Sequence, residues 1–173
     1  MKIIQGGVTA PLGFEAAGIE AGIKYQNRKD MALLYSQVPC IAAGTFTSNI
    51  VKAAPVKWDM KLVEESPFVQ AIVVNTGIAN AGTGAAGYEC TRKTAEKAAS
   101  LLGLPTEAVL IGSTGVIGPL LPMDRIQARF DGILFASVAC WIFFYALGDY
   151  LHITLMAKYA SLFGLGEHTG IEL

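Results

Sequence analysis

A short run of consecutive apolar residues, Ala71-Ile72-Val73-Val74, constrains the fold more than any other feature of this sequence. A run without polar alternation is typical of a strand that is covered on both faces. Residues 87–103 then predict a helix with one apolar stripe, which Gly103 ends. Val109-Leu110-Ile111 returns as a strand, and Leu121-Pro122-Met123-Asp124 begins another helical stretch. Strands that alternate with helices predict an α/β fold, a layered α/β domain.

The distribution of charge divides the chain into two parts. Only five of the 27 charged side chains lie after residue 129. We therefore expect one domain over residues 1–129 and a hydrophobic tail over residues 130–173. Within the tail, residues 133–147 are apolar apart from Ser137, a run shorter than the ~18–20 residues that span a membrane. A buried helix is the favoured interpretation, ahead of a membrane-associated helix or a tail unrelated to the domain.

Composition excludes several classes of function. The net charge of −1 and the absence of a basic run leave no electrostatic surface for nucleic acid. The cysteines, Cys40, Cys90 and Cys140, are odd in number and lack metal-ligand spacing, which argues against a disulfide framework and a structural zinc site. The N-terminal residues lack the apolar region of a secretory signal. These features predict a cytoplasmic protein.

One glycine-rich loop has the spacing of a nucleotide-binding motif. Residues 82–87 read Gly-Thr-Gly-Ala-Ala-Gly, they precede the expected helix, and Glu107 lies twenty residues beyond Gly87. In a dinucleotide-binding domain such glycines let the backbone approach a pyrophosphate at a helix N-terminus. Residues 75–81 separate this loop from the apolar run, however, whereas the nucleotide motif turns directly off its strand. A plain glycine-rich turn is the favoured interpretation, with nucleotide binding as the alternative.

A second glycine-rich loop, Gly112-Ser113-Thr114-Gly115-Val116-Ile117-Gly118, follows the expected strand 109–111 directly. A threonine hydroxyl next to a glycine N–H places two hydrogen-bond donors side by side. An oxyanion hole for acyl transfer requires such a pair, and the loss of one donor typically costs about 10²–10³ in rate. Taken alone, the same residues more often form an ordinary turn, and both interpretations stay open at this point.

Several segments, in order, resemble the ornithine acetyltransferase / glutamate N-acetyltransferase (ArgJ) family of arginine biosynthesis. The resemblance covers about residues 6–125. The segments are Gly7-Val8-Thr9-Ala10-Pro11-Leu12-Gly13-Phe14, Ala16-Ala17-Gly18-Ile19, Ala42-Ala43-Gly44-Thr45-Phe46-Thr47-Ser48-Asn49, Val51-Lys52-Ala53-Ala54-Pro55-Val56, residues 71–81, residues 112–118, and Leu121-Pro122-Met123. Within this pattern Asn80-Ala81-Gly82-Thr83-Gly84 matches a loop of the family that has no nucleotide role.

The resemblance implies the fold of the family's α chain and an acetyl transfer from N-acetylornithine to glutamate. Some members also use acetyl-CoA as a substrate, and neither a metal nor a bound organic cofactor is implied. Family precursors cut themselves before a threonine, and the new N-terminal threonine of the β chain is the nucleophile. The resemblance implies that Thr114 and Gly115 form the oxyanion hole. Ser113 is expected to shape the turn, and Asn75, Asn80 and Thr83 to support the loops.

The family pattern stops after about Arg129. The segments that surround the cut and provide the nucleophile in the family are not found among these 173 residues. The chain is therefore expected to need a β chain, in a hetero-oligomer, and to be inactive alone. A truncated or frame-disrupted product and a non-catalytic binding module of the same family are the alternatives, and a nucleotide-binding domain is a distant third.

Overall fold

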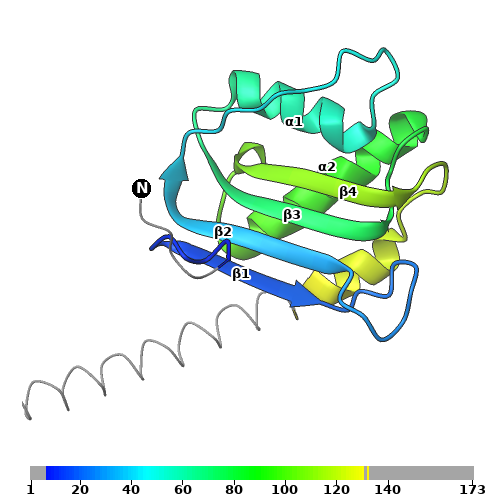
Figure 1. Ribbon diagram of the computed structural model, residues 1–173, viewed down its shortest axis with the longest axis horizontal. Helices are drawn as coiled ribbons and strands as arrows, with labels where there is room; N and C mark the ends of the chain where they lie inside the picture. Colours follow the sequence, from blue (N-terminus) through cyan, green and yellow to red (C-terminus); the bar gives the residue numbers. More distant parts are fainter. Residues whose placement is uncertain (1–6, 131, 133–173) are drawn as a thin grey trace, which may run out of the picture. The chain divides into compact units, whose positions relative to one another are not determined.

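The computed structural model of the chain describes residues 7–130 and residue 132. The expected tail helix at residues 133–147 lies outside the described residues, as does nearly all of the second of the two expected domains. The described part is a four-stranded sheet with helices, as expected for a layered α/β fold (Figure 1). Its elements are β1 (Phe14–Ile19), β2 (Met31–Cys40), α1 (Ala54–Glu65), β3 (Val69–Ile78), α2 (Gly84–Leu102), the 3₁₀ helix η1 (Thr106–Ala108), β4 (Val109–Val116) and helical residues 123–130.

The sheet has the strand order β1-β2-β3-β4. β1 pairs with β2, and β2 with β3, in antiparallel fashion, whereas β3 and β4 are parallel. A parallel pair needs a long crossover connection, and α2 provides it. Figure 1 shows α2 behind the sheet, with α1 above it. The parallel pair therefore ends on one side of the molecule, next to the N-terminus of α2.

The core lies between the helices and one face of the sheet. Alternate residues of each strand point into it, and so does one face of each helix. The core includes Met31, Leu33, Ala71, Val73, Val109 and Ile111 from the strands, and Trp58, Leu62, Ala95, Ala98, Ile126 and Phe130 from the helices.

The face of the sheet opposite the helices is more exposed than the sequence predicted. Ala71 and Val73 are buried as the apolar run predicted, but Val74 is 40% exposed. The expectation that this strand is covered on both faces is thus wrong for the described part of the chain, because both helices that flank β3 in sequence pack on the same side.

Helix α2 confirms the expected end and corrects the expected start. It ends at Gly103, which has a left-handed backbone with φ of 67°. Its first residue is Gly84, three positions before the predicted start at Gly87. The glycines that resemble a nucleotide motif therefore form the first turn of this helix and the loop that leads into it.

A buried cluster of hydrogen bonds connects β3 to α2. Asn80 is fully buried, and its Nδ2 donates to the carbonyl of Gly87 and to Oγ1 of Thr91, both at 2.9 Å. Thr83 Oγ1 donates to Oδ1 of Asn80 at 2.9 Å. A Cβ at Gly87 would lie 1.8 Å from Oγ1 of Thr83. This glycine therefore allows close packing against the cluster, and Asn80 and Thr83 support the loop as expected.

We expect Asn80→Ala to destabilise the chain by about 2–4 kcal/mol, because the change leaves buried polar groups without partners. Asn80 also has a φ of 49°, which asparagine tolerates better than alanine. Urea unfolding followed by circular dichroism measures the effect. Asn49→Ala is the matched control on an exposed loop and should change stability by less than about 0.5 kcal/mol. Equal effects of the two changes would contradict the structural role of Asn80.

Candidate active site

Polar and glycine residues face one another where the parallel strands β3 and β4 end. The register pairs Asn75 with Ser113, Thr76 with Thr114, and Gly77 with Gly115. In open α/β sheets, ligands bind beyond the carboxyl ends of parallel strands. This end of the β3–β4 pair is therefore the candidate active site.

Thr114 lies within strand β4. The sequence predicted a loop after residue 111, but pairing with β3 continues the strand to Val116. Alternation along the strand puts the side chain of Thr114 on the face opposite the helices. Thr114 is exposed, and its hydroxyl has no hydrogen-bond partner among the described residues. The hydroxyl is thus able to donate to a ligand.

The backbone conformation and the space at position 115 require glycine. Its φ is +133°, and a Cβ at this position would lie 2.2 Å from the carbonyl carbon of Gly77 on β3. Any side chain would therefore push the two strands apart. Gly115 was expected to provide a backbone N–H that no Cβ obstructs, and the contact with Gly77 is a second reason for glycine at this position.

Ser113 and Asn75 connect the two strand ends on the helix side of the sheet. Ser113 Oγ donates to Oδ1 of Asn75 at 2.6 Å, and Asn75 Nδ2 donates to the carbonyl of Ile78 at 2.9 Å. Asn75 is buried. Ser113 therefore supports the site from a strand rather than shaping a turn, and Asn75 has the supporting role that was expected for it.

Helix α1 covers the outer edge of β4, a contact that the sequence analysis did not identify. Trp58 Nε1 donates to the carbonyl of Val109 at 3.0 Å, and the backbone N–H of Ile111 donates to Oδ1 of Asp59 at 2.9 Å. Two adjacent side chains thus take the place of a neighbouring strand. The only signal in the sequence is a Trp-Asp pair in a helix with Pro55 in its first turn, and nothing in that pair indicates its target on β4.

Burial changes the titration of Asp59. Desolvation raises the pKa of this carboxyl to about 6, although the hydrogen bond from the Ile111 N–H acts in the opposite direction. The residue of β4 that Asp59 contacts, Ile111, lies three positions before Thr114. The charge state of Asp59 therefore bears on the strand that contains both candidate donors.

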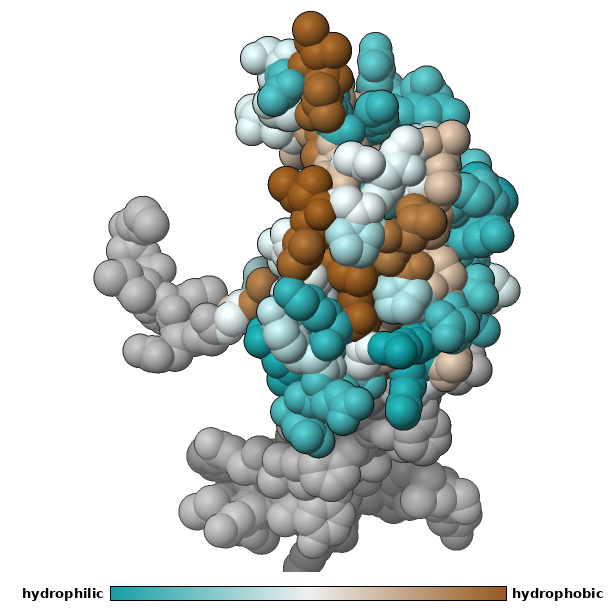
Figure 2. All heavy atoms as spheres, turned by 90° about the vertical axis from the view of Figure 1, so that its right-hand side faces the viewer, coloured by the Kyte–Doolittle hydropathy of each residue, from teal (hydrophilic) through white to brown (hydrophobic). Residues whose placement is uncertain are grey.

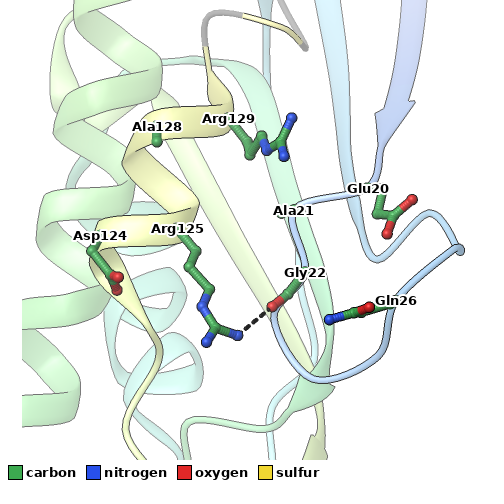
Figure 3. A pocket seen from close by; sticks show the side chains of 8 residues that line it. All are labelled: Glu20, Ala21, Gly22, Gln26, Asp124, Arg125, Ala128 and Arg129. Carbon is green, nitrogen blue, oxygen red and sulfur yellow. Dashed lines mark hydrogen bonds between the residues drawn. The ribbon is translucent and has the colours of Figure 1, made fainter.

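Two cavities flank the strand ends without including them. One, of about 490 Å³, surrounds the N-terminus of α2 and is lined by Lys52, Lys57, Thr83 and Tyr88 among others. The other, of about 500 Å³, lies between residues 123–130 and the loop after β1 (Figure 3). There Arg125 donates to the carbonyl of Gly22 at 2.9 Å. Thr114 and Gly115 line neither cavity, so the candidate site is on an open surface.

Exposed apolar side chains surround this end of the molecule. Figure 2 shows a stripe of hydrophobic atoms there with hydrophilic residues on either side. Exposed apolar residues in this part of the chain are Ile50, Val51, Val116, Ile117 and Leu120. An apolar border of this kind is typical of a surface that another polypeptide covers.

Other features of the described residues bear on metals and membranes. Over residues 7–130 and 132, no group of three or more His, Cys, Asp or Glu side chains is arranged to hold a metal ion. Cys40 and Cys90 are free thiols. None of the helices in this part of the chain is both long enough and apolar enough to cross a membrane.

We expect Asp59→Asn to be more stable than the wild type at pH 8 by about 1 kcal/mol, and equally stable at pH 4. The folded carboxyl holds its proton up to about pH 6, whereas the unfolded one loses it near pH 4, so wild-type stability falls as the pH rises through this window. Partial exposure of the side chain keeps the difference small. Urea unfolding at both pH values measures it, and a variant less stable than the wild type at pH 8 would contradict this assignment.

Comparison with known proteins identifies the family. The sequence matches the ArgJ family over residues 15–141, a range that extends beyond residue 129. It is 50% identical over 122 residues to the arginine biosynthesis bifunctional protein ArgJ of Thermotoga neapolitana, covering 70% of this chain and 30% of that protein. It is 52% identical over 120 residues to the protein of the same name from Streptomyces coelicolor, covering 69% of this chain and 31% of that protein. The chain thus spans about a third of the length of these relatives.

Solved structures agree with the sequence comparison. Ornithine acetyltransferase from Mycobacterium tuberculosis, solved in complex with ornithine, superposes with a TM-score of 0.71 at 43% identity, covering 74% of this chain and 69% of that chain. The arginine biosynthesis bifunctional protein ArgJ of Bacillus halodurans gives a TM-score of 0.68 at 36% identity, covering 76% of this chain and 71% of that chain. On the agreement of fold, motifs and sequence identity, the chain belongs to the ArgJ family.

Proposed function

We propose that this chain is the oxyanion-hole part of an acetyltransferase that moves an acetyl group from N-acetylornithine to glutamate in arginine biosynthesis. The observation that carries the proposal is the exposed Thr114 hydroxyl next to Gly115 at the end of two parallel strands. Membership of the ArgJ family supports the reaction class. Ornithine bound to the related enzyme of Mycobacterium tuberculosis supports the substrate class.

The proposed chemistry uses the two donors only when charge develops. A nucleophilic hydroxyl oxygen attacks the acetyl carbon of N-acetylornithine, and the carbonyl oxygen becomes negative. The Thr114 hydroxyl and the Gly115 N–H donate to that oxygen and stabilise it more than the neutral amide. Collapse of the intermediate breaks the C–N bond and releases ornithine, whose amine takes the proton that the attacking hydroxyl gave up. The glutamate amine then attacks the acetyl carbon of the acetyl-enzyme, the C–O bond breaks, N-acetylglutamate leaves, and a proton from the amine restores the hydroxyl.

The nucleophile belongs, in this proposal, to a β chain that is not among these 173 residues. Chain lengths support this arrangement. This chain covers about a third of its full-length relatives but about 70% of each matched chain in the solved structures. The solved chains are therefore about as long as this one, as expected if family members consist of two chains. The working unit would be a hetero-oligomer.

No resident metal or organic cofactor takes part in the proposed reaction, and acetyl-CoA would serve only as an alternative acetyl donor. We place the reaction in the cytoplasm, and the two free thiols support a reducing compartment.

A non-catalytic binding module is the second candidate, and the apolar border of the site favours it. The nucleotide-binding alternative has less support, because Thr83 and Asn80 occupy the space beside Gly87. Thermal shifts with N-acetylornithine, glutamate and NAD distinguish the three functions. Stabilisation by NAD alone would reverse this ranking.

We expect the purified 173-residue chain to release no ornithine from N-acetylornithine in the presence of glutamate. The reason is the missing nucleophile, since two hydrogen-bond donors cannot form an acetyl-enzyme. The assay is ornithine release, compared with a boiled sample of the same chain. A rate well above that of the boiled sample would show that a nucleophile lies within these residues.

In an assembly completed with a β chain of a relative, we expect Thr114→Val to lower turnover by about 10²-fold, because the change removes one oxyanion donor. Thr114→Ser retains the hydroxyl and should recover most of the rate. Ser113→Ala is the comparison variant, with a mild effect on turnover, since the Ser113 hydroxyl is bonded to Asn75. A large loss with Ser113→Ala and none with Thr114→Val would shift the assignment by one residue.

A further inference from the structure

A cavity of about 490 Å³ lies between the segment that leads into α1 and the N-terminus of α2. Two lysines line it, Lys52 just before α1 and Lys57 near the start of that helix. None of the described residues that line the cavity is acidic. The space therefore presents positive charge without a carboxylate to balance it, and we call it the lysine cavity.

The two ammonium groups of the lysine cavity are able to bind a ligand. Lys52 Nζ donates to the carbonyl of Asn49 at 2.7 Å, a bond that uses one of its donors and holds the group in place. Lys57 is exposed, and its ammonium group has no partner among the described residues. Lys61, one turn later in α1, instead forms an ion pair with Glu65 at 3.8 Å. An anion in the cavity would thus contact two cations that no carboxylate occupies.

The positions of the two helices add to this positive potential. Both helices begin at the end of the sheet where β3 and β4 end (Figure 1), and the N–H of Ala54 donates to the carbonyl of Asn80 at 3.2 Å. The first turn of neither helix contains an acidic residue. Thr83 does not cap α2 with its side chain, because its hydroxyl donates to Asn80. The helix dipoles therefore reinforce the attraction that the two lysines exert on an anion.

The chemistry of the lysine cavity favours a phosphate group. Two ammonium groups beside the start of a long helix suit a multiply charged anion better than a single carboxylate. Ile50 and Val51 also line the cavity and are largely exposed, so they offer contact to an uncharged part of the same ligand. Among the reactants of the proposed function, acetyl-CoA alone carries phosphates, and a long uncharged arm joins them to its thioester.

The lysine cavity is also close to the candidate active site. The loop that lines it is bonded to the segment after β4, since the N–H of Gly118 donates to the carbonyl of Ala81 at 3.0 Å. A Cβ at Gly82, which lines the cavity, would lie 3.5 Å from Cγ2 of Ile117. Ile117 is three positions after Thr114, which is roughly 10 Å along an extended chain. A ligand with its phosphates in the cavity and a long arm can therefore extend to Thr114.

We propose that the lysine cavity binds the phosphate groups of coenzyme A and so positions the thioester of acetyl-CoA at Thr114. The inference rests on the proposed function, in which acetyl-CoA is the alternative acetyl donor. N-acetylornithine and glutamate need no such site, because their charges lie within a few bonds of the reacting atoms. Use of the phosphorylated donor thus depends on Lys52 and Lys57.

Isothermal titration calorimetry of coenzyme A with the 173-residue chain tests the site without requiring chemistry. We expect Lys57→Ala and Lys52→Ala each to raise the Kd by about tenfold, because each removes a hydrogen bond between charged groups. Lys61→Ala is the matched control, since this lysine lies on the same helix but does not line the cavity, and it should bind like the wild type. Inorganic pyrophosphate should compete with coenzyme A and bind more weakly, because it lacks the arm.

The outcomes separate the possible sources of the phosphate. Coenzyme A that does not bind the wild type, or that binds both cavity variants undiminished, overturns the inference, and so does an equal loss with Lys61→Ala. Pyrophosphate that binds as tightly as coenzyme A also overturns it and would make the cavity a site for free phosphate. Binding that depends on Lys57, with no ornithine release by an assembly completed with a β chain, contradicts the proposed function alone. Circular dichroism verifies that Lys57→Ala is folded, as expected for a change at an exposed helical position.

Discussion

The close contact between β3 and β4 at Gly77 and Gly115 is the constraint on which the rest of the site depends. A Cβ at Gly115 would overlap the Gly77 carbonyl, so both strands can continue side by side to Ile78 and Val116 only because residue 115 has no side chain. This contact keeps Thr114 in a paired strand rather than a flexible loop. Pairing holds the backbone that carries this hydroxyl, and donors held in place before the reaction are a general requirement for electrostatic stabilisation of a transition state.

Strand β4 is supported differently in its two halves. In the first half, Trp58 and Asp59 form hydrogen bonds with the backbone of Val109 and Ile111 at the outer edge of the strand. The second half, which contains Thr114, is exposed. An uncovered strand edge invites pairing with other chains. The first half is therefore stabilised by α1, and the second half remains exposed. Burial raises the pKa of Asp59 to about 6. Ionisation of this carboxyl therefore lowers the free energy of unfolding as the pH rises toward that value.

The sequence predicted elements whose causes are local, and it missed contacts between distant residues. The end of α2 at Gly103 follows from the conformational freedom of glycine, and β3 from its β-branched run. The start of α2 was predicted late, because Gly84 and Gly87 are poor helix formers and tertiary contacts at Asn80 outweigh that preference. Three further features required coordinates: the contact of Trp58 with Val109, the extension of β4 to Val116, and the one-sided burial of β3. The first two depend on residues 51 and 38 positions apart, and no local pattern records such a pairing.

The one-sided burial of the sheet and the exposure of the candidate donors have a common physical origin. Both helices that follow β2 and β3 pack on one side, so the opposite side presents Ile72, Val74 and, next along the sheet, Thr114. Exposure of Ile72 and Val74 to water is unfavourable, whereas a threonine hydroxyl is well solvated. Water at Thr114, however, would weaken its interaction with a negative oxygen, because charges interact more strongly where the dielectric constant is low. Exclusion of water from this face would therefore strengthen the interaction of the Thr114 hydroxyl with a negative oxygen.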